Sequence, residues 1–438
     1  MPGLRDYVSV KKDGKRQHVQ KRLLMCSLRE AYNDFKEISE TDIGFSSFAA
    51  LKPKHCKLLG SSGSHNICVC TIHENIELML HGLKKYAFKN DTKFYFEQLL
   101  CNTSSRSKYC YLRECGNYPS RLACENNFFK ELDECNAFEI SFEQWISTDR
   151  CNLETVLQPV HEFVTNFYEK MEKLVTHDFI KTQQSSYLKH TKNNLGNGEA
   201  VIVCDFSENY TFVLQDAVQS SYWNNNQATI HPFVIYYVES GELKNRSFII
   251  ISEVLEHNTI AVQVFISKLM RFLENEKMQL KKAIFMSDGA ASQYKNRKNF
   301  ASLCKFKSIY KIDAEWHFFA TSHGKGPCDA IGGTLKRMAR NASIAKGHEH
   351  PITNAKELYD WANQKNNDCL TKMSFCYMSY KDYEQGVSQW SNIFQKTKMI
   401  TGTQKYHSFV PRSEHQIEAK LFSNDVTPSL HNIYKHVK

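Results

Sequence analysis

The sequence predicts an α/β fold, with a mixed-sheet domain over residues 199–350 that follows a mainly helical amino-terminal region. Three observations lead to this prediction. Apolar residues recur at helical spacing through much of the chain before residue 195, and strand-like apolar runs alternate with helical ones after the glycine-containing break at 194–198. Two of the later runs end in an aspartate. Strands interleaved with helices are typical of a layered α/β domain.

The composition is that of an ordinary folded protein, with 42% hydrophobic and 24% charged residues, and 438 residues are enough for two or three domains. The start of the chain has no apolar signal region, and no stretch approaches the ~18 apolar residues of a membrane span. We therefore expect an intracellular protein with no membrane partner. Its 15 cysteines are then expected to be reduced, as core residues or metal ligands.

Residues 1–59 are predicted to be a basic lead followed by a helix-turn-helix. Residues 1–22 contain seven Lys or Arg and two Asp, and such a cluster suits a polyanion such as nucleic acid, although a solvated tail has the same charge pattern. Segments 20–38 and 44–54 have helical spacing. Two helices joined by a short turn are compatible with a DNA-reading unit, but any helical hairpin has this pattern.

Residues 60–140 are rich in cysteine and histidine, and we expect either a structural zinc site or buried reduced cysteines there. Four thiol or imidazole groups occur within nine positions of segment 63–75, although their CxC spacing is less usual for zinc than CxxC. Further cysteines follow in 101–124. The candidate zinc ligands are His65, Cys68, Cys70, His73, Cys101, Cys110, Cys115 and Cys124.

The rest of the chain is divided into three parts. Residues 141–198 are predicted to be a helical linker region, 199–350 the α/β domain, and 351–438 a small appendage or tail. Within 199–350 the expected strands are 201–210, 211–216, 228–238, 247–255, 282–286 and 314–320, and the expected helices are 259–279, one that begins after 288, and 329–345.

Three aspartates stand at comparable places in this α/β part. Asp205 and Asp288 each follow a buried strand, and Asp329 begins the helix that follows the last strand. Carboxylates at neighbouring strand ends can hold two divalent cations, which stabilise the attacking and departing oxygens in phosphoryl transfer. We therefore predict that all three are catalytic metal ligands. The alternative for each is a structural role, such as helix capping by Asp329.

The glycine-rich stretch SHGKGPCD before the last helix does not match a nucleotide-binding loop. A Walker A loop requires Ser or Thr after its lysine, but Gly326 follows Lys325. A dinucleotide fingerprint requires a glycine where Asp329 stands. Basic side chains near the aspartates could form a DNA phosphate track, or simply face water. The candidate DNA contacts are His323, Lys325, Lys295, Arg297, Lys298, Lys336 and Arg337.

The order strand-Asp, strands, helix, strand-Asp, strand, helix-Asp is that of an RNase H-like core. Moreover, the segments DFSENY, SDGAASQYKN and AEWHFFATSHGKGPCDAIGGTLKR resemble a family of transposon-derived proteins of animal genomes, and the resemblance covers most of residues 1–345. It implies descent from a cut-and-paste DNA transposase with an RNase H-like catalytic domain. The chain departs from the family pattern at Tyr118, where a cysteine is usual, and at Tyr222, where a histidine is common.

These observations predict a DDD-type transposase that cleaves and transfers DNA strands with two Mg²⁺ or Mn²⁺ ions. Its partners would be double-stranded DNA carrying the element's terminal repeats and further copies of itself in a synaptic complex, and its location would be the nucleus. Two alternatives remain open. One is a domesticated, catalytically silent DNA-binding protein, and the other is an RNase H-like nuclease that acts on hybrids or repair intermediates.

Overall fold

The structure is a computed structural model that describes most of the chain in two compact units, Met1–Cys70 and Thr71–Lys438. The described residues are 7–12, 15–24, 28–39, 41, 43–58, 70–86, 91–101, 106–147, 149, 151–213, 226–324, 326–346, 352–366 and 373–434. None of their helices is both long enough and apolar enough to cross a lipid bilayer. The two units are considered separately below.

The described residues of the first unit form two short sheets and two helices. Its elements are β1 (Tyr7–Lys12), β2 (Lys15–Gln20), β3 (Arg22–Leu24), α1 (Leu28–Ile38), α2 (Phe45–Ala50) and β4 (Cys56–Leu58). The basic lead forms an antiparallel hairpin, and β3 pairs with β4 in parallel. The helix expected from residue 20 begins only at Leu28, because Arg22–Leu24 instead forms a strand that pairs with Cys56–Leu58.

The two helices of the first unit meet through aromatic rings. Tyr32 of α1 packs against Phe45 and Phe48 of α2, with ring centroids 5.5 and 5.4 Å apart. Its hydroxyl donates to the carbonyl oxygen of Ile43 in the turn, at 2.8 Å. This is the helix pair that the sequence predicts at 20–38 and 44–54, with both helices shorter than expected.

The second unit begins with a helical part built on one long helix. Its elements are α3 (Thr71–Gly82), η1 (Leu83–Tyr86), α4 (Thr92–Gln98), α5 (Lys108–Tyr111), α6 (Arg121–Glu134), β5 (Glu139–Ser147), β6 (Cys151–Pro159) and α7 (Val160–Asn193). Phe128, Phe163 and Phe167 lie in its core. Residues 139–159 form an antiparallel hairpin, so the helix expected there was wrong. The alternate burial of Ile140 and Phe142 explains the strand.

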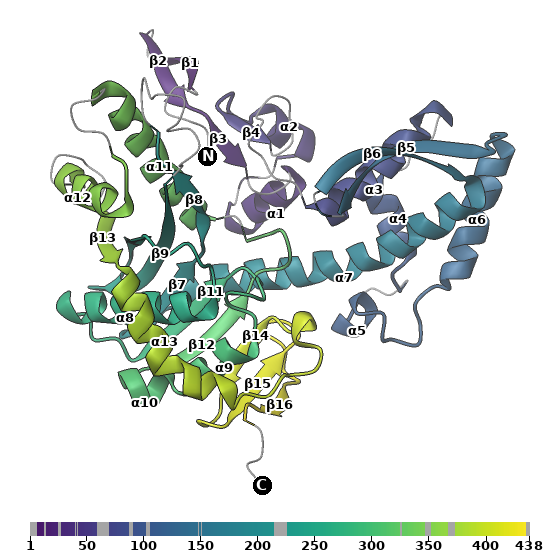
Figure 1. Ribbon diagram of the computed structural model, residues 1–438. Helices are drawn as coiled ribbons and strands as arrows, with labels where there is room; N and C mark the ends of the chain where they lie inside the picture. The colour runs from purple at the N-terminus through teal and green to yellow at the C-terminus, as the bar shows by residue number, and fades with distance from the viewer. Residues whose placement is uncertain are drawn as a thin grey trace. The chain divides into compact units, whose positions relative to one another are not determined.

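Helix α7 connects this helical part to the main sheet (Figure 1). Its 34 residues give a length of about 50 Å at 1.5 Å per residue. The first half packs into the helical core, and the second half contacts the sheet. There Gln184 donates to the carbonyl oxygens of Phe318 and His407, at 2.8 and 3.2 Å.

The main sheet is mixed, as predicted, and its five central strands run in the order β10-β9-β7-β11-β12. Their bounds are β7 (Glu199–Cys204), β9 (Gln227–Glu239), β10 (Glu242–Ser252), β11 (Lys282–Ser287) and β12 (Asp313–Phe318), and β8 (Ser207–Thr211) pairs with β9. Strands β7, β11 and β12 are parallel, whereas β9 is antiparallel to both of its neighbours. The predicted mixed α/β architecture is therefore confirmed.

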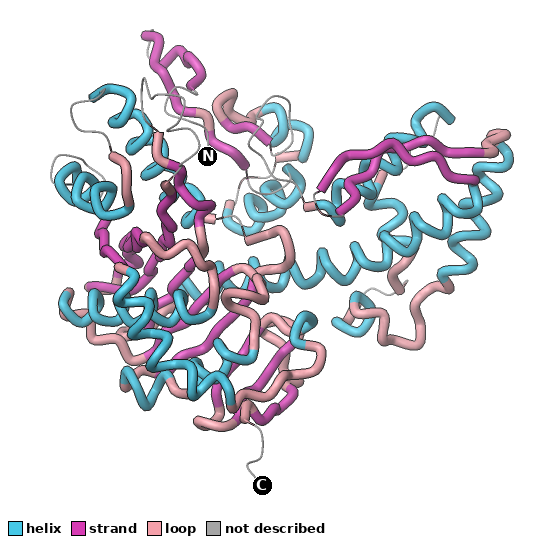
Figure 2. Tube along the Cα trace, in the orientation of Figure 1, coloured by secondary structure: helices cyan, strands magenta, loops and turns pink. Residues whose placement is uncertain are grey.

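Helices cover both faces of this sheet, which makes three layers (Figures 1 and 2). The helices are α8 (Thr259–Asn275), α9 (Arg297–Cys304), α10 (Phe306–Tyr310), α11 (Pro327–Lys346) and α12 (Ala355–Asn366). Ala200 and Ile202 of β7 share a core with α8, whereas Val201 and Val203 share one with the start of α11. Successive residues of a strand face opposite sides, so a central strand covered on both faces is apolar throughout.

The carboxy-terminal residues complete the same sheet, rather than forming the appendage or tail that the sequence suggests. Their elements are β13 (Met373–Met378), α13 (Tyr380–Gln395), η3 (Thr403–Lys405), β14 (Ser408–Pro411), β15 (Gln416–Lys420) and β16 (Ser429–Asn432). Strand β13 pairs with β10 at one side and β14 pairs with β12 at the other, which gives ten strands among the described residues. These strands are short and polar on one face, so their sequence lacks a clear strand pattern and looks like that of a loop.

Candidate functional site

Asp205 and Asp288 lie side by side at one edge of the sheet. Strands β7 and β11 are parallel neighbours in which Val203 pairs with Met286, and each aspartate follows two residues further along its strand. The backbone N–H of Asp205 donates to Pro232 in β9, at 3.4 Å. Both carboxylates are half-buried. The sheet therefore brings together the two acids that the sequence predicts at strand ends.

The start of α11 is held over this same edge. The buried Cys328 thiol donates to the carbonyl oxygens of Val203 and Pro232, at 3.3 and 3.6 Å. Gly332 allows this approach, because a Cβ atom there would lie 2.8 Å from the hydroxyl oxygen of Ser207. Asp329 stands next to Cys328 in the first turn of the helix. The third predicted acid is thus brought towards the end of β7 and the neighbouring middle part of β9.

Asp329 also has the capping role that the sequence leaves open. The helix begins at Pro327, two residues earlier than predicted. The Oδ2 atom of Asp329 accepts a hydrogen bond from the backbone N–H of Gly326, at 2.9 Å. A carboxylate that reaches back over a helix start satisfies one of its unpaired N–H groups. Asp329 is exposed, which leaves its other oxygen open to solvent or a cation.

The electrostatics of the edge are those of crowded negative charge. Burial, together with the charges of Asp288 and Asp329, raises the pKa of Asp205 to about 8. Burial and the charge of Asp329 also raise the pKa of Asp288. Among the described residues, neither Asp205 nor Asp288 forms an ion pair. Carboxylate oxygens are ligands that hard divalent cations accept, and a bound cation would favour the ionised forms, although the oxygens of the three acids do not all lie within 4.8 Å of one another.

The basic residues expected to contact DNA have different surroundings. Lys336 lies near the acidic edge, since the charges of Glu208 and Asp329 act on its ammonium group, although burial lowers its pKa. Arg337 is exposed on the same helix. Lys295 is only 4% exposed and donates to the carbonyl oxygen of Gln404, at 2.8 Å, so its burial removes it from this set. Lys325 lies outside the described residues.

Arg297 and Lys298 point towards the carboxy-terminal part of the chain. The guanidinium of Arg297 is 3.5 Å from the carbonyl oxygen of Thr397, and the ammonium of Lys298 lies 5.9 Å from the ring centroid of Phe394. Both contacts are to residues around the end of α13. These two side chains therefore pack against the fold, and any contact with DNA would have to be made beside α13.

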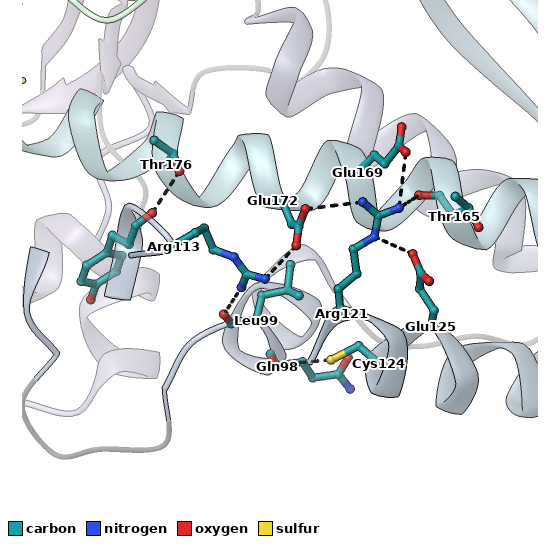
Figure 3. Close-up of polar contacts among 11 residues, drawn as sticks. Gln98, Leu99, Arg113, Arg121, Cys124, Glu125, Thr165, Glu169, Glu172 and Thr176 are labelled. Atoms are coloured by element: carbon teal, nitrogen blue, oxygen red, sulfur yellow. Dashed lines mark hydrogen bonds and ion pairs between the residues drawn. The ribbon is translucent and has the colours of Figure 1, made fainter. Parts of the chain in front are cut away.

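The structure separates the predicted zinc ligands into groups. Cys101, Cys110 and Cys115 have their sulfur atoms within 4.8 Å of one another. Cys124 is not in that group, because its thiol donates to the carbonyl oxygen of Gln98, at 3.7 Å (Figure 3). His65 and Cys68 lie outside the described residues.

A charged network ties α6 and the preceding turn to α7 (Figure 3), and its Arg113 stands two residues before Cys115. Arg113 donates to Glu172 at 2.7 Å and to the carbonyl oxygen of Leu99 at 2.6 Å. Arg121 pairs with Glu125 at 2.6 Å. These contacts fix the turn that carries Cys115 independently of any metal.

The remaining candidates, Cys70 and His73, lie close to two histidines that the sequence does not predict as zinc ligands. Their partners are His177 of α7 and His323, which the sequence assigns to DNA contact. His177 lies within a continuous helical pattern, and His323 is 250 residues away from His73. No local spacing rule could have joined them, because their proximity depends on the tertiary fold.

The fold and this edge define an α/β protein with a candidate site for divalent metals at the carboxyl ends of parallel strands. The chain belongs to the family described as "Domain of unknown function (DUF8701)", whose model matches residues 184–423. Two further family models, also described as domains of unknown function (DUF8699 and DUF8700), match residues 1–60 and 71–175. No curated protein matches the chain.

Two solved structures are similar to parts of the chain. One is titled "Mos1 transposase paired-end complex with left transposon end", at 11% identity and a TM-score of 0.28, over 75% of this chain and 97% of that one. The other is titled "Crystal structure of NurA bound to dAMP and manganese", at 12% identity and a TM-score of 0.12, over 47% and 46%. At these TM-scores neither likeness establishes a shared fold.

Proposed function

We propose that this protein is a transposase-like enzyme that cleaves and joins DNA strands at a site formed by Asp205, Asp288 and Asp329. The observation that carries the proposal is the placement of Asp205 and Asp288 at the ends of adjacent parallel strands, where burial and the charge of neighbouring carboxylates raise their pKa values. Such perturbed carboxylates on an open edge are candidates for function.

The strand order supports the same proposal. The first strand of the domain, β7, lies at the centre, with β9 and β10 on one side and β11 and β12 on the other. This is the arrangement expected of an RNase H-like core, in which the acids at the ends of the first and fourth strands face each other. A third acid from the helix after the fifth strand completes the set, and Asp329 stands there.

The three carboxylates would hold two Mg²⁺ or Mn²⁺ ions, which when bound activate an attacking oxygen and stabilise the leaving 3′-oxygen. The chain's own residues would orient the DNA. Lys336, near Asp329 on α11, would attract a backbone phosphate, and Arg337 is a further candidate for a phosphate contact. Gly324 has no side chain between Asp288 and the solvent side of its loop, which favours a close approach of the DNA backbone.

The substrate would be double-stranded DNA with the terminal repeats of the parent element, bound in the nucleus by more than one copy of the chain. The first unit, with its basic hairpin and paired helices, would recognise these ends. A transposase requires specific ends, whereas an RNase H-like repair nuclease does not. Comparison of a duplex carrying the repeats with a scrambled duplex and an RNA–DNA hybrid distinguishes these two activities.

The decisive experiment measures Mg²⁺- and Mn²⁺-dependent cleavage of a repeat-containing duplex by the full chain and by Asp288→Asn. We expect a loss of about 1000-fold or more, because the metal site supplies several kcal/mol of charge stabilisation and each 1.36 kcal/mol is a factor of ten. Asp313→Asn is the matched control, since Asp313 is exposed at the other end of β12. Equal cleavage by wild type and Asp288→Asn would exclude the proposed site.

A catalytically silent DNA-binding protein is the second candidate, and the capping hydrogen bond of Asp329 is the observation that favours it. In that case the acids would be kept for the fold alone. Binding of the repeat duplex at the wild-type level, together with no metal-dependent cleavage by any variant including the wild type, would support this candidate over the enzyme.

A further inference from the structure

Three imidazole rings from distant parts of the second unit meet at one point. His73 comes from α3, His177 from the middle of α7, and His323 from the loop between β12 and α11. Their ring centroids are 5.0 to 5.2 Å apart, and the Nε2 atoms of His177 and His323 are separated by 3.0 Å. The buried Cys70, which directly precedes α3 in the chain, is the fourth member of the group.

The spacing of these four groups fits a tetrahedral metal ion. The candidate ligand atoms all lie within 4.8 Å of one another. Zinc binds imidazole nitrogen at about 2.0–2.1 Å and thiolate sulfur at about 2.3 Å, so tetrahedral ligands are about 3.3–3.8 Å apart. Only a small adjustment of the side chains is needed to reach this geometry. One thiolate and three imidazoles are also ligands that zinc accepts.

The carboxylate of Asp178 lies beside His73, in the position that an outer-shell partner of a metal-binding histidine occupies. The Nε2 atom of His73 lies 3.3 Å from Oδ1 of Asp178, and the ammonium of Lys181 is 2.6 Å from the same oxygen. Metal-binding histidines commonly donate their second ring N–H to such a carboxylate, which fixes the tautomer and the ring orientation. This pairing assigns Nε2 of His73 to the carboxylate and Nδ1 to the metal.

We propose that Cys70, His73, His177 and His323 bind one structural Zn²⁺ ion. Four protein ligands close the coordination shell, so the ion would stabilise the fold and take no part in chemistry. This set replaces the local one that the sequence suggests, because two of its members come from α7 and from the loop after β12. The proposal does not depend on the proposed DNA chemistry.

His323 lies in the loop between β12 and α11, so the proposed zinc ion would hold this loop in place. The next residue is Gly324, at which a Cβ atom would lie only 3.2 Å from Cβ of Asp288. Six residues after His323 comes Asp329. A zinc ion bound to His323 would therefore fix the loop between β12 and α11 against α3 and α7, and hold in place the segment that leads to the third acid.

The first test is the zinc content of the purified full chain, measured by inductively coupled plasma mass spectrometry. We expect His177→Ala and His323→Ala each to lose one equivalent of zinc per chain relative to wild type. His190→Ala is the matched control, because His190 is exposed on the same helix as His177, and it should keep the full content. Wild-type zinc content in His177→Ala would overturn the proposal, as would loss on Cys68→Ser without loss on His177→Ala.

The second test remains informative even if the alanine variants fold poorly. Cys70→His keeps four ligands, so after replacement of zinc by Co²⁺ it should bind one equivalent as the wild type does. Its near-ultraviolet spectrum should lack the part of the thiolate-to-cobalt charge-transfer absorption that comes from Cys70, and the wild-type minus variant difference spectrum should show that band. A difference spectrum without the band would overturn the assignment of Cys70. Any cobalt bound by Cys101, Cys110 and Cys115 is present in both proteins and therefore cancels in the difference.

Discussion

Two sets of acidic side chains on the main sheet have opposite electrostatic surroundings. At the carboxyl ends of β7 and β11, burial and neighbouring carboxylates raise the pKa of Asp205 to about 8 and also raise that of Asp288. On β12, burial alone would raise the pKa of Glu315, but hydrogen bonds and charge from His317 and Lys282 lower it to about 2. The same sheet thus holds one set without cationic partners and one with them.

The geometry around Glu315 explains its behaviour. Its Oε1 atom accepts from the hydroxyl of Tyr187 at 3.0 Å and lies 3.2 Å from Nε2 of His317, and its Oε2 atom is 3.1 Å from the ammonium of Lys282. Tyr187 belongs to α7, so this network attaches the long helix to the sheet. A buried carboxylate with this many partners is part of the structure.

The contrast shows how to tell a structural acid from one available to a ligand. Both kinds are largely buried, so burial does not separate them. What differs is whether the fold itself supplies positive charge. Glu315 has a cationic partner within the fold, whereas Asp205 and Asp288 have none among the described residues. Unpaired, partly buried carboxylates are expected at a site that is completed by a bound cation.

Among the tests of this contrast, the largest expected effect is on the binding of Mg²⁺ at different pH values. Below a pKa of about 8 Asp205 is mostly protonated, and the ion must displace that proton, so its apparent affinity should rise with pH and level off above 8. One pKa unit corresponds to a factor of ten, which gives an increase of about 100-fold between pH 6 and pH 9. Isothermal titration calorimetry of the magnesium-free protein with Mg²⁺ at several pH values measures this change in affinity directly.

Asp205→Asn is the control for that titration. The amide cannot release the proton, so the variant should bind Mg²⁺ more weakly and with little dependence on pH in this range. A wild-type affinity that stays constant from pH 6 to pH 9 would show that Asp205 is not a ligand, and the contrast with Glu315 would then have no functional meaning.

Glu315→Gln tests the other side of the comparison and should act on stability. The amide keeps the size and can accept the hydrogen bond from Tyr187, but it removes the negative charge that pairs with Lys282. We expect a loss of about 2 kcal/mol in the free energy of unfolding at pH 7. Because the pKa of Glu315 is lowered in the fold, its contribution is present above pH 4.5 and is lost as the pH falls through about 2.

Denaturant unfolding at pH 7 and at pH 3 measures this effect, and the difference between wild type and variant should shrink at the lower pH. Glu242→Gln is the control, since Glu242 is exposed on the same sheet and should change stability by less than about 0.5 kcal/mol. A Glu315→Gln variant as stable as Glu242→Gln at pH 7 would mean that the paired acid is not structural.

Much of the α/β part could be predicted because its signals are local. The apolar runs of β7, β10 and β11 and the amphipathic face of α8 are determined by side-chain periodicity, and their order along the chain gave the positions of Asp205 and Asp288. The helix start at Pro327 was placed within two residues. The acidic edge itself follows from topology, since the ends of parallel neighbours lie together.

The predictions that differ from the structure depended on weaker or non-local signals. The sequence predicts a helix where the structure has the hairpin β5-β6. Only alternate residues of β5 are buried in part of the strand, and the outward-facing residues are polar or charged, so the strand pattern is weak. The carboxy-terminal strands were read as a tail, since edge strands are short. Lys295 looked available for DNA, but the fold buries it against Gln404. His177 has no sequence signal as a ligand, because its partners come from other elements.

The smallest expected effect concerns Gly324, which lies against Asp288 at the acidic edge. A methyl group there would place Cβ 3.2 Å from Cβ of Asp288, closer than ordinary contact, so one of the two must move by a few tenths of an ångström. Gly324 has no left-handed backbone angle, so Gly324→Ala should change stability by less than about 1 kcal/mol. Misplacing a catalytic group by about 1 Å costs about 100-fold, and so this smaller shift should lower metal-dependent cleavage about tenfold.

Gly333→Ala is the matched control, because a Cβ atom at Gly333 of α11 would meet no atom within 4 Å. It should keep wild-type cleavage and gain up to about 1 kcal/mol of stability, as alanine is favoured over glycine inside a helix. If Gly324→Ala also cleaves at the wild-type rate, the loop does not need to approach Asp288 so closely. The acidic edge would then tolerate a displacement that a preorganised metal site should not tolerate. A loss of cleavage in Gly324→Ala but not in Gly333→Ala would instead link the loop, and the helix that follows it, to the chemistry of Asp288.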